Sequence, residues 1–95
     1  MKLVIRKRAT KTMQETADWV EKKNTIGSGD RWLEKVVDDF LQRAKSNVKH
    51  AICRDEKLAI RKYHCFTYNQ KWVVAYRIEG NNFIIYRFIY GPKLV

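Results

Sequence analysis

Residues that break or cross-link a chain are scarce in this sequence. Its 95 residues include four glycines, one proline and two cysteines. Little of the chain is therefore predicted to be linker, and two cysteines are too few for a scaffold held together by disulfides. No apolar run approaches the roughly 20 residues that a membrane-spanning helix needs, so we expect no association with a membrane.

The first residues also lack the pattern of a secretory signal. The apolar run at residues 3–5 is interrupted at once by the basic residues 6–8. We therefore expect a protein of the reducing cytoplasm, in which Cys53 and Cys65 are free thiols.

Acidic residues are half as numerous as basic ones. Ten Asp and Glu stand against twenty Lys and Arg, which gives a formal net charge of +10. A hydrophobic content of 45% is that of a folded protein, and the length predicts a single domain over residues 1–95. A charge of this size attracts a polyanion, which is either a nucleic acid or an acidic protein partner.

The first half of the chain has the pattern of one strand and two helices. Residues 2–7 are rich in β-branched side chains and predict a short strand. Apolar residues recur at helical spacing from 13 to 20, and Thr10 or Thr12 is the expected N-cap. A turn at residues 26–30, with Ser28 or Asp30 as cap, leads to a strongly amphipathic helix.

The second half has the pattern of three strands. Residues 58–66, 71–78 and 83–90 are β-rich, and turn residues separate them at 67–70 and 80–82. The predicted fold class is α+β, with an N-terminal strand, an antiparallel helical hairpin and a three-stranded antiparallel meander. The hairpin is expected to cover one face of the sheet and leave the other partly open.

Alternation within the last two predicted strands indicates which residues face the helices. The even positions are apolar or aromatic and are expected in the core: Trp72, Val74, Tyr76, Ile78, Ile84, Tyr86, Phe88 and Tyr90. A three-residue turn sets odd positions opposite odd positions, so Arg77 and Arg87 are expected to share the open face. This mixed basic and apolar face is the candidate working surface.

Several segments together resemble the RelE/ParE superfamily of type II toxins. They are Tyr-Arg-Ile-Glu-Gly-Asn-Asn at 76–82, Ile-Tyr-Arg-Phe-Ile-Tyr-Gly at 85–91, Ile-Arg-Lys-Tyr at 60–63 and Gly29 at the start of the second helix. The resemblance implies the fold described above and a toxin that a cognate antitoxin holds inactive. In this family RelE-like members cleave messenger RNA on the ribosome, and ParE-like members poison DNA gyrase.

The resemblance also implies candidate site residues. RelE-like RNases carry an arginine near the position of Val73, for which Lys71 is the nearest substitute, and another where Lys93 stands. With His64 for proton transfer, Lys71 and Lys93 are the catalytic candidates if the chain is an RNase. Residues expected to bind nucleic acid or a partner are Arg61, Lys62, Arg77, Arg87 and Tyr90. This match to the RNase residues is poor, which favours a ParE-like mode.

Other interpretations stay open. The basic face is also typical of a nucleic-acid-binding module, of a degenerate non-toxic family member kept for partner binding, or of a solvated surface. Trp19 and Trp32 either pack between the helices or anchor a homodimer or another partner. No cofactor is expected. A metal site built on His64 and Cys65, with His50 and Cys53, is disfavoured because neighbouring strand residues point to opposite faces.

Overall fold

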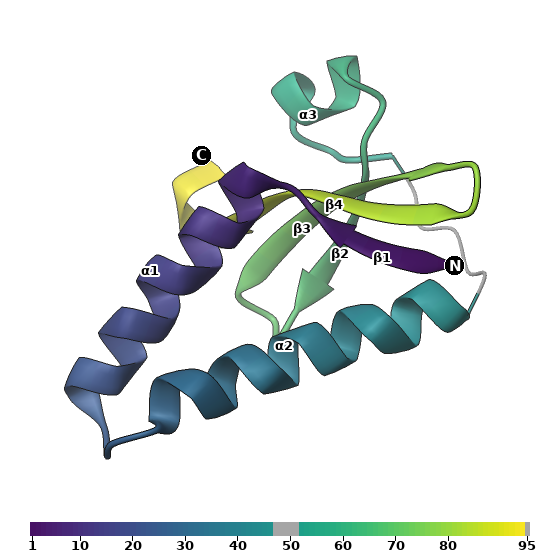
Figure 1. Ribbon diagram of the computed structural model, residues 1–95. Helices are drawn as coiled ribbons and strands as arrows, with labels where there is room; N and C mark the ends of the chain where they lie inside the picture. Colours follow the sequence, from purple (N-terminus) through teal and green to yellow (C-terminus); the bar gives the residue numbers. More distant parts are fainter. Residues whose placement is uncertain (47–51, 95) are drawn as a thin grey trace.

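The protein is an α+β domain, seen here in a computed structural model that describes residues 1–46 and 52–94. Its elements follow in the predicted order of strand, helical hairpin and three strands, with two short helices added (Figure 1). They are β1 (Lys2–Ile5), α1 (Lys7–Lys23), α2 (Ser28–Lys45), α3 (Glu56–Ile60), β2 (His64–Tyr68), β3 (Trp72–Glu79), β4 (Asn82–Tyr90) and the 3-10 helix η1 (Gly91–Leu94).

The strands form one mixed four-stranded sheet in the order β1-β4-β3-β2. The last three strands pair antiparallel, which confirms the predicted meander. β1 adds to β4 in parallel, with Lys2 beside Asn82 and Ile5 beside Ile85. The final strand therefore lies inside the sheet, between the first strand and β3.

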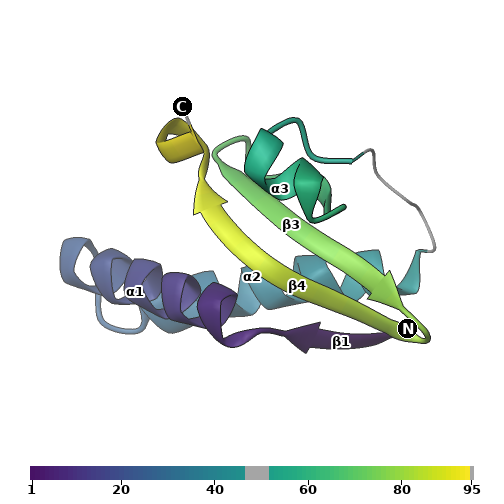
Figure 2. The same ribbon diagram turned by 90° about the horizontal axis from the view of Figure 1, so that it is seen from above.

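The helical hairpin packs against one face of this sheet, and Figure 2 looks onto the other face. α1 buries Ala9, Met13 and Ala17, which follow one another at four-residue spacing on one side of the helix. α2 buries a second such row, namely Gly29, Val36, Phe40 and Ala44. The predicted antiparallel hairpin is confirmed.

The helix starts differ from the expected caps. α1 begins at Lys7, after Arg6, and has no side-chain cap. α2 begins at Ser28 after Gly27, whose φ of 89° lies in the left-handed region that favours glycine. The N-terminal N–H groups of α2 are capped from the other helix, because the Glu21 carboxylate accepts hydrogen bonds from Gly27 at 2.7 Å and from Gly29 at 2.9 Å.

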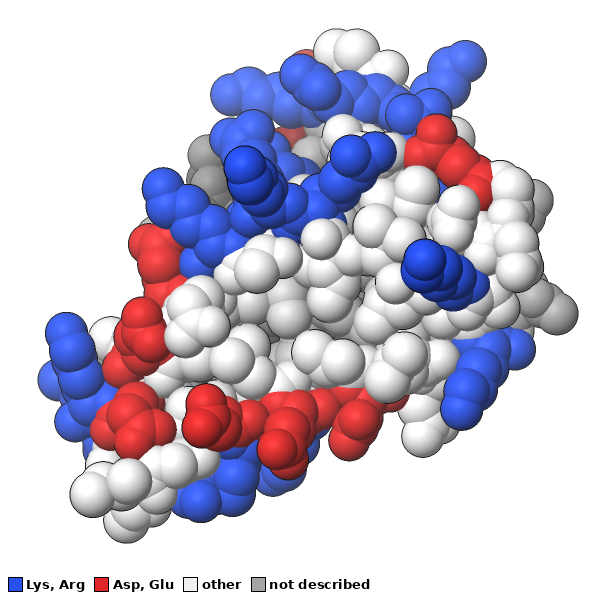
Figure 3. Space-filling view, viewed as in Figure 1, with Lys and Arg blue, Asp and Glu red and all other residues white. Residues whose placement is uncertain are grey.

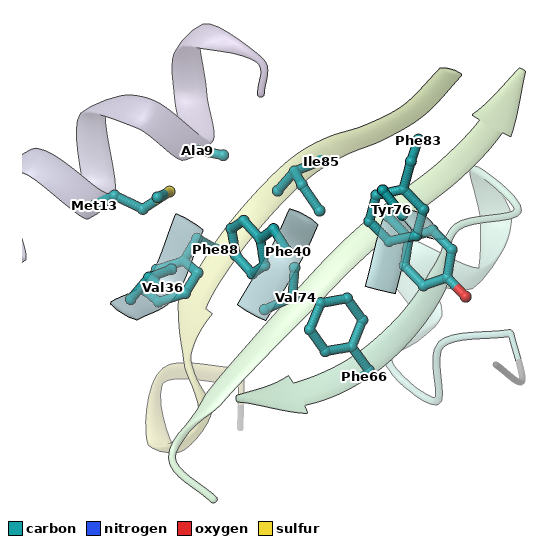
Figure 4. Close-up of a cluster of buried hydrophobic side chains, with 11 residues drawn as sticks. Ala9, Met13, Val36, Phe40, Phe66, Val74, Tyr76, Phe83, Ile85 and Phe88 are labelled. Carbon is teal, nitrogen blue, oxygen red and sulfur yellow. The ribbon is translucent and has the colours of Figure 1, made fainter. Parts of the chain in front are cut away.

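The main core lies between the hairpin and the sheet (Figure 4). It is rich in aromatic rings in edge and stacked contacts: Phe40 meets Phe66 at 5.9 Å between centroids, and Tyr76 stacks on Phe83 at 4.6 Å. Such pairs add roughly 0.5–1.5 kcal/mol each beyond the burial of their area. The core members are Ala9, Met13, Val36, Phe40, Ala44, Phe66, Val74, Tyr76, Phe83, Ile85 and Phe88.

The β3–β4 hairpin corrects the expected register. Its turn has two residues, and an extra residue in β4 shifts the pairing from Tyr76–Ile85 to Ala75–Arg87. Because the turn has two residues, Phe83 and Ile85, rather than Ile84 and Tyr86, face the helices. The β-bulge leaves Tyr86 without a partner and reverses the phase of the strand after it, so Phe88 faces the helices again. Trp72, Val74, Tyr76, Ile78 and Phe88 pack on the helix side as predicted.

The region before β2 is the second correction, because the predicted strand at 58–66 is strand only from His64 onward, and residues 58–60 are the end of a helix. Asp55 caps α3 by accepting a 3.3 Å hydrogen bond from the Leu58 N–H, so the chain turns where an extended segment was expected. α3 lies on the sheet face opposite the hairpin. A smaller core forms under it from Cys53, Leu58, Tyr63 and Ala75.

The expectation of free thiols is wrong, because Cys53 and Cys65 form a disulfide. The Cys53 N–H donates to the Tyr63 carbonyl at 2.9 Å, which places the segment before α3 beside β2. The two Cα atoms then lie 4.9 Å apart, within the usual range for a disulfide.

Among the described residues, no helix is both long enough and apolar enough to cross a membrane.

Candidate functional site

A groove lined by basic residues opens on the face opposite the helical hairpin. It has a volume of ≈ 830 Å³ and lies where the β1–α1 junction, α3 and β4 meet. We call it the basic groove. Its lining consists of six basic residues, Arg6, Lys7, Arg8, Lys57, Arg61 and Arg87, and four apolar or aromatic ones, Leu58, Ile60, Tyr63 and Tyr86. No carboxylate lines it.

Pairing of β1 with β4 brings the basic N-terminal residues to this groove. The Arg6 N–H donates to the Ile85 carbonyl at 2.9 Å, so the chain leaves the sheet beside the middle of β4. From there the guanidinium of Arg6 reaches over the ring of Tyr86, 5.3 Å from its centroid. Contact at this distance is within the range of a cation–π interaction.

Two stacked tyrosines form the floor of the groove. Tyr63 follows α3 and is 7% exposed, and its ring stacks on that of Tyr86 at 5.0 Å between centroids. The two-residue turn puts Tyr86 on the face on which Tyr63 lies, because Tyr86 follows the helix-facing Ile85, and the bulge then keeps Arg87 on that face as well. Arg77 lies over the other ring, with its guanidinium carbon 6.0 Å from the centroid of Tyr63.

Arg87 is the basic residue set most deeply between the others. Burial lowers the pKa of its guanidinium from the ordinary value, and the neighbouring charges of Arg8 and Arg61 lower that pKa further. Tyr63 and Asp55 act in the opposite direction. Arginine keeps its charge at neutral pH in spite of such shifts, so the groove holds repelling cations close together.

The lining of the basic groove includes no carboxylate, and the nearest ones act from its margin, Asp55 on Arg87 and Glu79 on the Tyr86 hydroxyl. Among the described side chains the one ion pair joins Arg43 to Asp39 on α2, far from the groove in sequence and on the other layer. Figure 3 shows the wider segregation: Lys and Arg gather over α3 and the start of α1, and most Asp and Glu line the helical hairpin. A site of this kind gains most from an anionic ligand, which relieves the repulsion.

A second hollow of ≈ 730 Å³ continues the basic groove toward the end of β4. The two share Lys57, Leu58 and Arg87. At its far end lie Trp72 and Tyr90, and their rings are 5.3 Å apart. Its rim carries the carboxylates of Glu15, Asp55 and Glu56, so the positive character ends there.

The predicted binding residues are only partly gathered at the groove. Arg61 and Arg87 line it, and Arg77 reaches it through Tyr63. Arg77 and Arg87 share the face opposite the hairpin, as predicted. The two-residue turn alone would have put them on opposite faces, and the bulge in β4 returns Arg87 to the face of Arg77. Lys62 is exposed in the turn after α3, and Tyr90 lies in the second hollow.

The three catalytic candidates are not brought together. The His64 ring lies on the helix side of the sheet, 5.6 Å from that of Tyr76, while Lys71 lies in the exposed β2–β3 turn. His64 pairs with Tyr76, five residues from Lys71, and this spacing is about 17 Å along a strand. Catalytic groups must reach the same reacting phosphodiester, and this separation is too large for His64 and Lys71 to do so.

The backbone at Lys93 does lie near Lys71, because the Gly91 N–H donates to the Lys71 carbonyl at 2.7 Å. The side chain of Lys93 lies outside the described part of the structure. His50, named in the disfavoured metal interpretation, also lies outside it. In the described part, the two cysteines are joined to each other and no three metal-ligating side chains cluster.

Sequence reasoning underrated Arg6, Arg8 and Lys57, and expected Tyr86 in the core. Arg6 and Arg8 belong to a basic N-terminal cluster, and nothing in the sequence connects this cluster to α3 or β4. The connection becomes apparent only from the pairing of β1 with β4. A signal for Lys57 did exist, since Asp55 followed by Glu56 is the start of a capped helix.

Taken together, the groove gathers six basic side chains around two stacked tyrosines, with no carboxylate in its lining. Comparison of the chain with known proteins found no matching family model and no matching curated protein.

Proposed function

We propose that this chain is a toxin of the RelE/ParE type, the toxin component of a type II toxin–antitoxin system. The order of strand, helical hairpin and meander supports the proposal, because it is the arrangement that the resemblance implies. The basic groove is its working surface, and an acidic segment of the cognate antitoxin neutralises it by covering that groove.

The observation that carries the proposal is the set of six basic residues around an aromatic floor without a carboxylate. Crowding of like charges costs folding energy, and Asp55 and Tyr63 act against this repulsion at Arg87. A binding partner of opposite charge would offset it. The separation of His64 from Lys71 supports a mode that needs no catalytic constellation, which the resemblance associates with DNA gyrase as the target.

Expression of the chain in a bacterial host without its antitoxin tests the proposal. We expect growth arrest, and we expect the Arg61→Gln/Arg87→Gln variant to lose it. Lys23→Gln/Lys35→Gln is the matched control, since it removes the same charge from exposed positions on the hairpin. Normal growth with soluble, folded wild-type protein would contradict the proposal. Site-specific cuts in ribosome-bound transcripts after induction would instead assign the RelE-like mode.

A nucleic-acid-binding module without toxicity is the second candidate. The stack of Tyr63 on Tyr86, with Arg6 and Arg77 over the two rings, favours it, because aromatic and guanidinium planes recur in such surfaces. Salt-dependent binding of RNA or DNA by the isolated chain, without growth arrest, would support this candidate over the toxin.

A further inference from the structure

The disulfide closes a loop that contains part of the basic groove. Cys53 precedes α3 and Cys65 lies in β2, 12 residues further on. Between them the chain supplies Lys57, Arg61 and Tyr63 to the lining of the groove. The positions of two of the six basic residues of the groove, and of one of its two floor tyrosines, therefore depend on how this loop is held.

Few other interactions hold the loop. α3 has five residues, too short to be stable as an isolated helix. Its one buried side chain is Leu58, at 3% exposure, and Tyr63 adds its stack on Tyr86. Hydrogen bonds from Cys53 to Tyr63 and from Tyr63 to Leu58 run within the loop itself. The disulfide is thus a covalent cross-link that supplements the packing of Leu58 and Tyr63 over Ala75 in holding the loop to the sheet.

The disulfide can be reached from solvent. A surface hollow of ≈ 430 Å³ is lined by both cysteines together with Thr67 and Val73. Cys65 is partly exposed, whereas Cys53 is buried. One positive and one negative side chain, Arg54 and Asp55, line the same hollow.

We propose that Cys53–Cys65 is a redox clasp for the basic groove. When it is closed, α3 holds Lys57 and Arg61 over the tyrosine floor. A dithiol reductant opens it: one reductant thiolate attacks a sulfur of the disulfide, and its second thiol resolves the mixed disulfide. Two electrons pass to the protein, which gains two thiols, and the reductant leaves as its own disulfide. Disulfides in reducing compartments commonly have such a switching role.

The opened clasp weakens anion binding, and this consequence rests on the proposed function of the groove. We expect oxidised protein to bind a short fluorescein-labelled oligouridylate, measured by fluorescence anisotropy, roughly tenfold more tightly than protein reduced with a phosphine. The slope of log affinity against log salt should fall in magnitude by about 1.4 on reduction, because two phosphate contacts of about 0.7 each are lost. Reoxidation should restore both values.

Hydrogen exchange gives an independent readout. Amides of residues 56–63 should exchange faster after reduction, whereas those of α2 should not change. Cys53→Ser/Cys65→Ser should behave as reduced protein in either condition, and Thr67→Ala, which alters the hollow but keeps the disulfide, should respond as wild type. If the serine variant does not fold, the reduction and reoxidation of wild type decide the matter.

Three results overturn the clasp. Two titratable thiols in folded protein treated with oxidised glutathione show that the disulfide does not form. If the oligonucleotide binds with equal affinity in both redox states, the clasp is wrong and the proposed function is unaffected. Binding in neither state removes the clasp, and the growth test then decides the proposed function independently.

Discussion

The ring of Tyr63 stacks on the ring of Tyr86, with centroids 5.0 Å apart and planes inclined by 25°. This contact joins the segment after α3 to β4, which no hydrogen-bonded strand pairing does among the described residues. Arg6 lies over one ring and Arg77 over the other. The stack therefore holds together cations from both ends of the chain.

Replacing Tyr86 by leucine should loosen this arrangement. We expect a loss of about 1 kcal/mol in the free energy of unfolding from the missing ring pair, and weaker binding of a polyanion because Arg6 loses its support. Denaturant unfolding and fluorescence anisotropy measure the two effects. Tyr86→Phe is the control: it keeps the ring and removes only the exposed hydrogen bond to Glu79, so it should stay within about 0.5 kcal/mol of wild type.

Removal of one groove charge should show in the salt dependence of binding. Lys57→Gln is expected to weaken binding of an oligonucleotide and to reduce its salt slope by about 0.7, as for one lost phosphate contact. Lys35→Gln removes the same charge from an exposed position on α2 and should leave the slope unchanged. Equal effects of the two substitutions would mean that net charge, rather than the groove, governs binding.

Gly29 is required where the two helices approach. A Cβ at this position would lie 2.5 Å from the carbonyl oxygen of Ala17, so Gly29→Ala must push α1 and α2 apart. We expect a loss of about 1–3 kcal/mol, measured by chemical denaturation. Gly80→Asn is the comparison: nothing lies within 4 Å of a Cβ there, and asparagine tolerates its φ of +60°. A large loss of stability in Gly80→Asn as well would mean that the fold tolerates no replacement of these glycines, and not that Gly29 is required by the close approach of the helices.

Glu21 should make stability depend on pH. Hydrogen bonds from the N–H groups of Gly27 and then Gly29 lower the pKa of its carboxyl from the ordinary value. The folded state therefore gains stability above about 4.3, the pKa of an unfolded glutamate, and loses it as the pH falls through the lower folded pKa. Glu21→Gln removes this gain at neutral pH.

Denaturation midpoints at several pH values measure the effect. The difference between wild type and Glu21→Gln should be largest near pH 7 and shrink toward acid. Glu34→Gln, at an exposed position on α2, is the matched control for the loss of one carboxylate. A gap between wild type and Glu21→Gln that is constant with pH would contradict the capping role.

Periodicity in the sequence was enough to predict the order of elements, because α2 and the strands bury one side each. It was not enough for residues 58–60, whose apolar character suits a strand as well as a helix. There the hydrogen bond from the Leu58 N–H to the Asp55 carboxylate favours the helix over a weak propensity for a strand. The prediction of which residues in the first part of β4 face the helices was wrong for a similar reason. Ile84, Ile85 and Tyr86 are all acceptable on either face, so the alternation of the sequence cannot locate a bulge.

The candidate site was predictable only in part. The prediction that Arg77 and Arg87 share one face rests on an assumed three-residue turn, and it agrees with the structure only because the bulge compensates for the shorter turn. Arg6 and Arg8 could not be joined to them, since parallel pairing between β1 and β4 links residues about 80 positions apart in the chain. The disulfide was missed because the expected compartment, not the geometry, set the prediction for Cys53 and Cys65.

The inner position of β4 also sets the time at which this protein can fold during synthesis. Until residues 82–90 have left the ribosome, β1 has no neighbour and the apolar faces of α1 and α2 have only part of the sheet to cover. A nascent chain interrupted before Asn82 would therefore have neither a complete core nor a basic groove. Folding and the appearance of the binding surface are expected to come together, late in translation.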